Sequence, residues 1–387
     1  MAESERWITT TEAAQRLGVK RASLYAYVSR GLLHSERRPG QQESLFDRAE
    51  VDSLAAASRP ARAAQPLLRF RGVATGVSSQ RDGDLLYRGV PLADMTDLPF
   101  DRAAALVLGD PDAATGSLPA VPVPVVRAVV LLPLERRMPV AVQALAGSDP
   151  FGPDLSPDLV RSTALALVPR AVVLMGGDDR AGVTDLPRAL MRSLAGHDGT
   201  PGGRRLLGVM LTALLDHGLT ASTVAARVAA STRAGLPDCL CAAYAAMAGP
   251  LHGAAPIAAH ALLAHGAAPR DVVAEATRRH GTVPGFGHFL YPDGDPRAEL
   301  VLDALADLRG TTRLRRRVDE VVRVVADGTG RHPNVDLATA AVLHALDLPA
   351  AAGEVLFQVA RSYGVAAHVL EEYGETPLRW RGREATG

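Results

Sequence analysis

Apolar residues recur three and four positions apart through most of the chain, which is the spacing of amphipathic helices. Beyond residue 124, long segments of Ala, Leu and Val keep this spacing, and Gly and Pro separate one segment from the next. Alternation of apolar and polar residues, which is typical of strands, is nowhere long enough to indicate a large sheet. The pattern therefore predicts a mainly α protein.

The first 57 residues have the pattern of a small helix-turn-helix domain. Thr9 and Glu12 have the spacing of a capping box, which begins a helix. The pattern then predicts a second helix over residues 20–30, two short strands around a Pro-Gly turn over 32–46, and a closing helix over 47–57. In this order the elements resemble the MerR-like winged helix family, whose second helix enters the major groove of DNA.

Cations and hydroxyl-bearing residues of this domain are candidates for DNA contacts. Some lie early in the predicted second helix and some beside the turn of the wing, where phosphates would lie: Lys20, Arg21, Ser23, Tyr25, Arg37 and Arg38. Such charges are also typical of an ordinary solvated surface. The sequence leaves both interpretations open.

Two segments interrupt the apolar pattern. Residues 58–66 read SRPARAAQP and lack helical spacing, so we interpret them as a linker between the first domain and the rest. Residues 110–124 are polar and rich in Pro, but helical spacing resumes on both sides, so we expect a surface loop there.

Composition narrows the possible partners. The chain has 387 residues, 47% hydrophobic and only 4% aromatic, which favours two or more helical domains packed through small side chains. Its formal charge is zero, so any affinity for nucleic acid must be local.

Cys239 and Cys241 lack the partners of a zinc site or a disulfide framework. No apolar run reaches the ~18 residues of a membrane helix, and we expect a cytoplasmic protein without a metal.

Three histidines lie in settings rich in Gly and Pro: LLDHGLTAST around His217, AGPLHGAAP around His252, and PGFGHFLYPDGDPRA around His288. A single histidine beside glycine is commonly a helix cap or a hydrogen-bonded polar group. Glycines, however, let a backbone approach a ligand closely and expose main-chain N–H groups. Two histidines bracketed by glycine therefore favour the lining of a pocket.

These motifs resemble the citrate synthase family, and they occur in the family's order: LLYRGVPL at 85–92, DHGLTAST at 216–223, GPLHG at 249–253, GFGH with DPRA at 285–298, and HPNVDLATAAVLHALDLP at 332–349. The resemblance extends from about residue 68 to the C-terminus. It implies a homodimer in which a large and a small helical domain close over oxaloacetate. We accordingly predict a winged helix-turn-helix domain at 1–57, a linker at 58–66 and a synthase-like body at 67–387. The small domain of this body, at about 253–345, interrupts the large domain, at about 67–252 and 346–387.

The resemblance also implies the reaction, an acyl transfer in which a short acyl-CoA condenses with oxaloacetate and water to give citrate and CoA. His252 matches the donor that stabilises the enolate of the thioester, and Asp336 matches the base that removes the α-proton. His288 matches the group that polarises the ketone. No cofactor is bound permanently, because the coenzyme A thioester is a co-substrate.

Substrate contacts follow from the same resemblance. Arginine suits a dicarboxylate because its planar guanidinium holds a carboxylate with two hydrogen bonds. The implied oxaloacetate-binding residues are His217, Arg297, Arg361 and Arg381. Arg381 would cross from the partner subunit, and Arg379 or Arg383 could serve instead. The implied CoA-binding residues are Pro284, Gly285, Phe286 and Gly287.

Simpler interpretations and rival functions remain open at this stage. Asp336 could cap a helix, and Asp-Pro-Arg at 295–297 could be an ordinary helix start. Propionyl-CoA could replace acetyl-CoA, since one methylene changes a pocket only slightly and leaves the catalytic residues unaffected. A metabolite-sensing DNA-binding regulator could also use this fold, although a pure sensor would have no need of a base such as Asp336.

Overall fold

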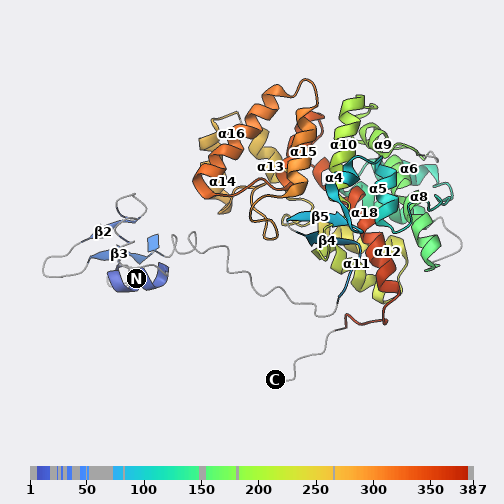
Figure 1. Ribbon diagram of the computed structural model, residues 1–387, viewed down its shortest axis with the longest axis horizontal. Helices are drawn as coiled ribbons and strands as arrows, with labels where there is room; N and C mark the ends of the chain where they lie inside the picture. The colour runs from blue at the N-terminus through green and yellow to red at the C-terminus, as the bar shows by residue number, and fades with distance from the viewer. Residues whose placement is uncertain are drawn as a thin grey trace. The chain divides into compact units, whose positions relative to one another are not determined.

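The computed structural model describes residues 7–17, 24, 28, 33–36, 44–48, 50–51, 73–81, 83–147, 154–179, 183–264 and 266–381. The chain divides into two compact units, Met1–Val73 and Ala74–Gly387. Helices dominate the second unit, and strands occur only as short segments among the described residues (Figure 1). The prediction of a mainly helical protein is confirmed.

The first unit contains a small antiparallel sheet and a helix. Its described elements are β1 (Trp7–Thr9), α1 (Thr10–Leu17), β2 (Ser35–Glu36) and β3 (Leu45–Asp47). β3 lies between β1 and β2 and pairs with both. The two strands predicted over 32–46 are therefore present, and β1 is a third strand that the pattern did not reveal. The unit has its own apolar core, formed by Ile8, Ala13, Ala14, Leu24, Leu33, Phe46 and Val51.

The predicted capping box begins α1. The Thr9 hydroxyl accepts a hydrogen bond from the main-chain N–H of Glu12, and the Glu12 carboxylate accepts one from the N–H of Thr9. Leu24 and Val28, in the predicted second helix, are helical. The proposed linker at 58–66 and the candidate DNA contacts lie outside the described residues: Lys20, Arg21, Ser23, Tyr25, Arg37 and Arg38.

The second unit begins with the antiparallel sheet β4 (Ser78–Arg81), β5 (Asp84–Tyr87) and β6 (Val90–Pro91), in that order. Helices follow to the C-terminal end: α4 (Leu92–Thr96), α5 (Phe100–Val107), α6 (Val123–Val130), α7 (Leu134–Ala146), α8 (Pro157–Met175), α9 (Leu186–Ala195), α10 (Pro201–Leu214), α11 (Ala221–Ser231), α12 (Leu236–Met247), α13 (Pro256–Ala264), α14 (Pro269–His280), α15 (Pro296–Ala306), α16 (Thr312–Thr329), α17 (Val335–Ala345) and α18 (Ala352–Tyr373). The loop expected at 110–124 is present, and it ends where α6 begins.

Helix α18 is the centre of this unit. Nearly every one of its residues is buried, because α7, α8, α10, α11 and α12 all pack against it. Helices α13 to α17 form a neighbouring group in which α13 packs on α17 and α14 on α16 (Figure 1). Helix α10 contacts both groups, through α18 and through α15 and α17. The loops that follow α10, α12 and α14 can therefore meet beside the middle of α18.

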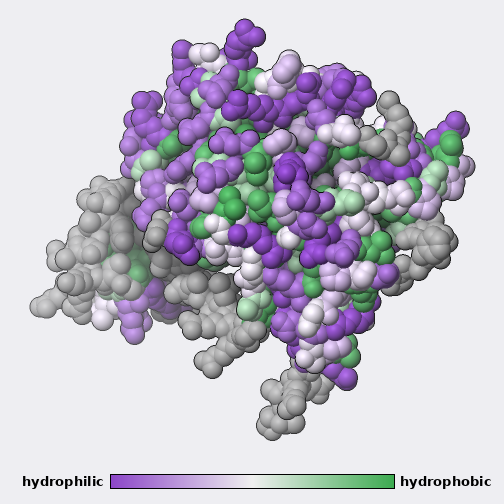
Figure 2. Space-filling view, turned by 45° about the vertical axis from the view of Figure 1, so that its right-hand side comes forward, coloured by the Kyte–Doolittle hydropathy of each residue, from purple (hydrophilic) through white to green (hydrophobic). Residues whose placement is uncertain are grey.

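The surface seen in Figure 2 is mainly hydrophilic, with hydrophobic residues in scattered patches. No described helix combines the length and the apolar character that a membrane span requires. Cys239 is buried and Cys241 is partly buried, and neither forms a disulfide.

Gly364, in α18, allows this helix to pack closely against the loop that follows α10. A Cβ atom built on Gly364 would lie 2.2 Å from the carbonyl oxygen of Leu215 and 2.8 Å from a carboxylate oxygen of Asp216. Neither the helix nor the loop backbone can move away cheaply, because both are packed in the interior.

We therefore expect Gly364→Ala to destabilise the protein by about 1–3 kcal/mol, the usual cost of overpacking a core. Gly328 in α16 is the matched control, because a Cβ there would meet no atom within 4 Å. Gly328→Ala should leave stability unchanged or raise it by up to about 1 kcal/mol. Urea denaturation of both variants measures the difference, and equal stabilities would contradict the close packing.

Candidate active site

Six residues predicted for the site come from different segments of the second unit. His217 lies between α10 and α11, His252 between α12 and α13, and His288 between α14 and α15. Arg297 is in the first turn of α15 and Asp336 in the first turn of α17, while Arg361 lies in the middle of α18. Only the tertiary packing can bring these six side chains together.

The aromatic rings of the site are in contact. The ring of His217 meets that of His288 edge to face, with 5.1 Å between centroids. Nε2 of His217 lies 3.0 Å from the hydroxyl of Tyr291, whose ring centroid is 5.0 Å from that of His288. The guanidinium of Arg297 lies over the Tyr291 ring at 5.6 Å. Tyr291 thus joins two predicted site histidines to a predicted site arginine, a role that the sequence analysis missed.

Main-chain contacts place the His288 loop beside the start of α17. The N–H of Gly287 donates to the carbonyl of His332 at 2.8 Å, and the N–H of Asn334 donates to the carbonyl of Gly285 at 2.9 Å. Gly285 has a φ of +84°, and a Cβ there would lie 2.9 Å from the Leu337 side chain. Only glycine fits such a position without strain. These contacts lie within the segment predicted to bind CoA: Pro284, Gly285, Phe286 and Gly287.

Asn334, and not Asp336, caps α17. The Asn334 side-chain oxygen accepts a hydrogen bond from the N–H of Asp336 at 3.0 Å, and its amide group donates to the carbonyl of Gly287 at 3.0 Å. Among the described residues, no hydrogen bond engages the Asp336 carboxylate. The capping interpretation of Asp336 is therefore wrong, and its carboxylate is available for proton transfer.

Burial raises the pKa of Asp336 to about 7, with Arg297 opposing the shift and Asp295 adding to it. A carboxyl with this pKa is partly ionised at neutral pH and binds a proton more strongly than an ordinary aspartate. A general base works best when its pKa lies near the operating pH. The environment of Asp336 therefore suits proton abstraction.

Arg297 and Asp295 form a buried pair at the start of α15. Nε and Nη2 of Arg297 donate to the two carboxylate oxygens of Asp295 at 2.9 and 2.8 Å. Asp295 also caps α15 and accepts a hydrogen bond from the N–H of Val335 at 3.0 Å. The Asp-Pro-Arg segment is therefore an ordinary helix start that also holds a buried cation. Asp295 is a further site residue that the sequence analysis missed, although it lies within the motif.

Arg361 is almost completely buried, with 1% of its surface exposed. Its Nε donates to the carbonyl of Leu214 at 2.9 Å, and its Nη1 lies 3.4 Å from the hydroxyl of Thr220. Leu214 and Thr220 precede and follow His217 in the chain. Arg361 thus ties α18 to the loop that carries His217.

His252 is oriented by a serine. Its Nε2 lies 2.7 Å from the hydroxyl of Ser222, on α11. If the hydroxyl donates to Nε2, the proton of the neutral imidazole is on Nδ1 and can be donated to a ligand. Ser222 lies within the DHGLTAST motif, but its spacing gave no sign that it would face His252.

Burial, together with the two arginines, keeps the histidines neutral. Burial, followed by Arg361, lowers the pKa of His252 to about 4, and burial, followed by Arg297, lowers the pKa of His288 to about 4. Burial and then Arg297 and Arg361 hold the pKa of His217 well below its ordinary value. Near pH 7 all three rings can donate a hydrogen bond without carrying a charge.

Arg381 is apart from this group. Its side chain is exposed, and its main-chain N–H donates to the carbonyl of Leu378. Arg379, the alternative, is engaged by Glu372, with Nε–Oε1 and Nη2–Oε2 distances of 2.7 and 2.6 Å. Arg383 lies outside the described residues. In the part of the chain that the structure describes, no group of three His, Cys, Asp or Glu side chains could hold a metal ion.

Comparison with known proteins matches most of the chain. A family model described as "Citrate synthase, C-terminal domain" matches residues 138–382, and one described as "Helix-turn-helix domain" matches residues 7–59. "Putative citrate synthase 2" of Mycobacterium tuberculosis is 30% identical over 75% of this chain and 83% of that protein. "Citrate synthase" of Haloferax volcanii is 32% identical, but the match covers 42% of this chain and only 45% of that protein.

A solved structure has the same fold. The citrate synthase of Thermoplasma acidophilum, in a ternary complex with carboxymethyl coenzyme A and oxaloacetate, matches 82% of this chain and 94% of its own, with a TM-score of 0.69 and 21% identity. The predicted fold is therefore confirmed. By the extent of the family match, the chain belongs to the citrate synthase family and carries a helix-turn-helix domain in its N-terminal part.

Proposed function

We propose that the protein condenses acetyl-CoA with oxaloacetate and water to give citrate and CoA. The observation that carries this proposal is the convergence of three neutral histidines, two buried arginines and one aspartate with a raised pKa. The reaction needs a base for a weak carbon acid, donors for two carbonyl oxygens and cations for two carboxylates. Each need has a matching group in this site.

The first step is removal of a proton from the α-carbon of the thioester by Asp336. Negative charge then develops on the thioester oxygen, and the neutral His252 donates a hydrogen bond to it. A neutral imidazole suits this step, because its N–H is retained and no charge has to be desolvated beforehand. The raised pKa of Asp336 narrows the gap to the much higher pKa of the thioester α-carbon, which makes the proton transfer less unfavourable.

The second step is attack of the enol carbon on the ketone of oxaloacetate. His288 donates to the ketone oxygen, where negative charge develops as the carbon–carbon bond forms. Arg297 and Arg361 bind the two carboxylates of the oxo-acid, and His217 completes the pocket. Water then hydrolyses the thioester of the condensation product, which releases CoA and citrate.

Other features of the body follow the same family pattern. We propose that residues 284–287 contact CoA, because this glycine-containing loop immediately precedes His288. We also propose a homodimer in which Arg381 reaches the site of the partner subunit. The exposed Arg381 is free to do so, whereas Arg379 is held by Glu372. The use of propionyl-CoA, giving 2-methylcitrate, is the alternative within the same chemistry.

Replacement of the base tests the mechanism. Asp336→Asn keeps the shape of the side chain but cannot accept the proton, so turnover should fall by roughly two to four orders of magnitude. Binding of oxaloacetate should persist. The control is Asp327→Asn on the exposed surface of α16, which should be as active as the wild type. Steady-state release of CoA thiol measures both, and near-normal activity of Asp336→Asn would refute the assignment.

The pH dependence gives a second test. Because the active form of Asp336 is the carboxylate and its pKa is about 7, kcat/KM for the acyl-CoA should increase about tenfold per pH unit below pH 7 and level off above it. The histidines are neutral throughout this range, since the pKa values of His252 and His288 are about 4. A profile that is flat between pH 5.5 and 7, measured where the protein stays folded, would contradict Asp336 as the base.

We propose a second function, DNA binding, for the domain at 1–57, which a linker at 58–66 would join to the body. The family match at 7–59 and a separate apolar core around Phe46 favour this proposal. A dimer would carry two such domains, and two-fold symmetry implies a palindromic site.

Selection from random DNA duplexes tests this function. The full-length protein should enrich an inverted repeat, with affinity that falls steeply as salt rises. Arg37→Ala combined with Arg38→Ala should weaken binding to all sequences, and Arg21→Ala should relax the sequence preference. Failure to enrich any sequence at low salt, with and without oxaloacetate and acetyl-CoA, would rule out sequence-specific DNA binding.

A further inference from the structure

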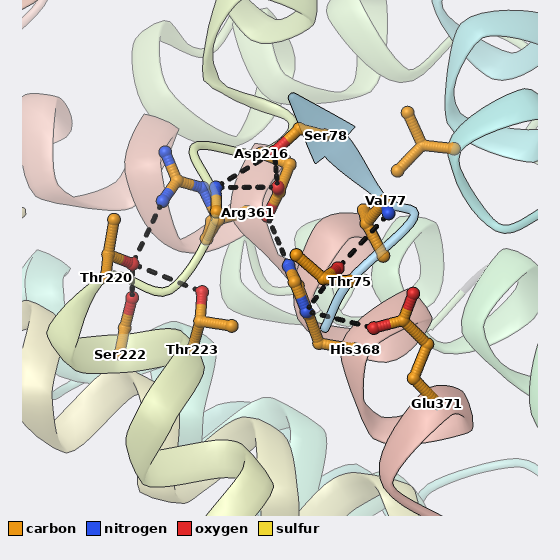
Figure 3. A network of polar contacts seen from close by, with 12 residues as sticks. Thr75, Val77, Ser78, Asp216, Thr220, Ser222, Thr223, Arg361, His368 and Glu371 are labelled. Atoms are coloured by element: carbon orange, nitrogen blue, oxygen red, sulfur yellow. Dashed lines mark hydrogen bonds and ion pairs between the residues drawn. The ribbon is translucent and has the colours of Figure 1, made fainter. Parts of the chain in front are cut away.

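Behind the candidate active site lies a second cluster of polar residues to which the proposed mechanism assigns no role. Asp216 and His368 are at its centre, and both are completely buried. Figure 3 shows His368 between Asp216 and Glu371, with Thr75 beside its ring. Asp216 immediately precedes His217 in the chain, so the cluster adjoins the loop that carries a predicted substrate contact.

Asp216 holds the main chain around His217. One of its carboxylate oxygens, Oδ2, accepts hydrogen bonds from the hydroxyl of Ser78 at 2.5 Å and from the N–H of Gly218 at 2.8 Å. The hydroxyl of Ser78 is also within 3.0 Å of the N–H of Gly218. The hydroxyl of Tyr87 donates to the carbonyl of Asp216 at 3.1 Å. The residues on both sides of His217 are therefore fixed by side chains from the β4–β5 sheet.

His368 holds Asp216 from the opposite side. Its Nε2 lies 3.2 Å from Oδ1 of Asp216, and its Nδ1 lies 2.9 Å from Nη1 of Arg227. A guanidinium can only donate, so a neutral ring accepts at Nδ1 and carries its proton on Nε2, facing Asp216. Burial lowers the pKa of His368, but Asp216 and Glu371 outweigh it and raise that pKa, which favours a charged ring beside the Asp216 carboxylate. Arg227 is itself fixed, because it is completely buried and pairs with Glu371 and Glu372 at 2.8 and 2.9 Å.

The geometry of α18 joins this cluster to the substrate site. Arg361, Gly364 and His368 are one turn apart along the helix and share a face. Arg361 donates to the carbonyl of Leu214, and Gly364 lets the carbonyl of Leu215 approach the helix. Burial raises the pKa of Asp216, but His368, Arg361 and the Ser78 hydrogen bond outweigh it and lower the pKa to about 2. Asp216 is therefore a carboxylate at all working pH values.

We propose that Asp216 and His368 are positioning residues of the reaction, which hold His217 in the orientation that binds the oxo-acid without touching the substrate themselves. This inference rests on the proposed condensation, in which His217 contacts oxaloacetate. It assigns a functional role to the buried pair, which would otherwise be a stabilising contact only. Its consequence is that changes to the pair should affect the binding of oxaloacetate through His217.

Two substitutions of His368 separate positioning from packing. His368→Gln keeps an N–H group near the position of Nε2, whereas His368→Leu removes it. We expect His368→Leu to raise the KM for oxaloacetate by about 10²-fold, the scale of a small misplacement of a binding group. His368→Gln should retain most of the affinity, and kcat should change less than KM in both. Equal loss in the two variants, or loss of kcat alone, would overturn the proposal.

A double-mutant cycle then tests whether the effect passes through His217. If it does, adding His368→Leu to a His217→Gln protein should change the KM for oxaloacetate by less than about threefold, since the positioned group is already absent. If the two effects multiply, His368 acts independently of His217 and the proposal is wrong. Ser78→Ala is a second, less disruptive variant for the same test, because it removes one hydrogen bond to Asp216 and keeps the carboxylate. It should raise the KM in wild type but not in His217→Gln.

Controls separate misfolding and failure of the proposed function from failure of this inference. His280→Gln and Asp303→Asn lie on exposed faces of α14 and α15 and should behave as wild type. Each variant is checked by thermal unfolding, and oxaloacetate binding is measured by calorimetry as well as by turnover. If His368→Leu does not fold, Ser78→Ala and His368→Gln complete the test. Ser78→Ala should raise the KM for oxaloacetate in the wild type but not in His217→Gln, and His368→Gln should retain most of the affinity. A wild-type protein that neither binds nor turns over oxaloacetate would overturn both proposals, whereas an active wild type with unaffected variants would overturn this one alone.

Discussion

The site depends on the burial of two guanidinium groups, those of Arg297 and Arg361, which are 3% and 1% exposed. A buried charge must be paired or hydrogen-bonded, because desolvation is costly. Asp295 pairs with Arg297 and, through the N–H of Val335, also ties α15 to α17. Arg361 uses the carbonyl of Leu214 and so ties α18 to the His217 loop. Satisfying the two charges therefore positions much of the surrounding chain.

The same charges tune the acid–base groups. Together with burial, Arg361 and Arg297 keep His252 and His288 neutral, so each can donate a hydrogen bond to a developing oxyanion. Asp336 responds in the opposite sense, because its desolvation outweighs the attraction of Arg297 and its pKa rises. One desolvated environment thus gives neutral donors and a stronger base. Pairs of groups whose pKa values are pushed in different directions are typical of active sites.

Local signals in the sequence predicted much of the fold and the main candidates. The Thr9–Glu12 capping box formed as expected, and helical spacing gave the mainly helical body. The sequence could not decide between capping and catalysis for Asp336, since Asn334 two residues earlier has the same capping capacity.

Contacts between distant segments were beyond the sequence analysis. Ser222 faces His252, and His368 faces Asp216, only because α11 and α18 pack where they do. Periodicity shows which face of a helix is buried, but it does not show which polar group lies opposite. The same limit applies to Tyr291, whose contacts with His217 and His288 follow from the path of the loop between α14 and α15.

The proposed joining of an acyl-CoA to oxaloacetate is best measured by the release of free CoA thiol by the wild-type protein. We expect thiol to appear only when oxaloacetate is present, and kcat/KM to be higher for acetyl-CoA than for propionyl-CoA. A preference for propionyl-CoA would assign the protein to 2-methylcitrate formation. If folded protein releases no thiol from either thioester when oxaloacetate is added, the protein does not catalyse this condensation.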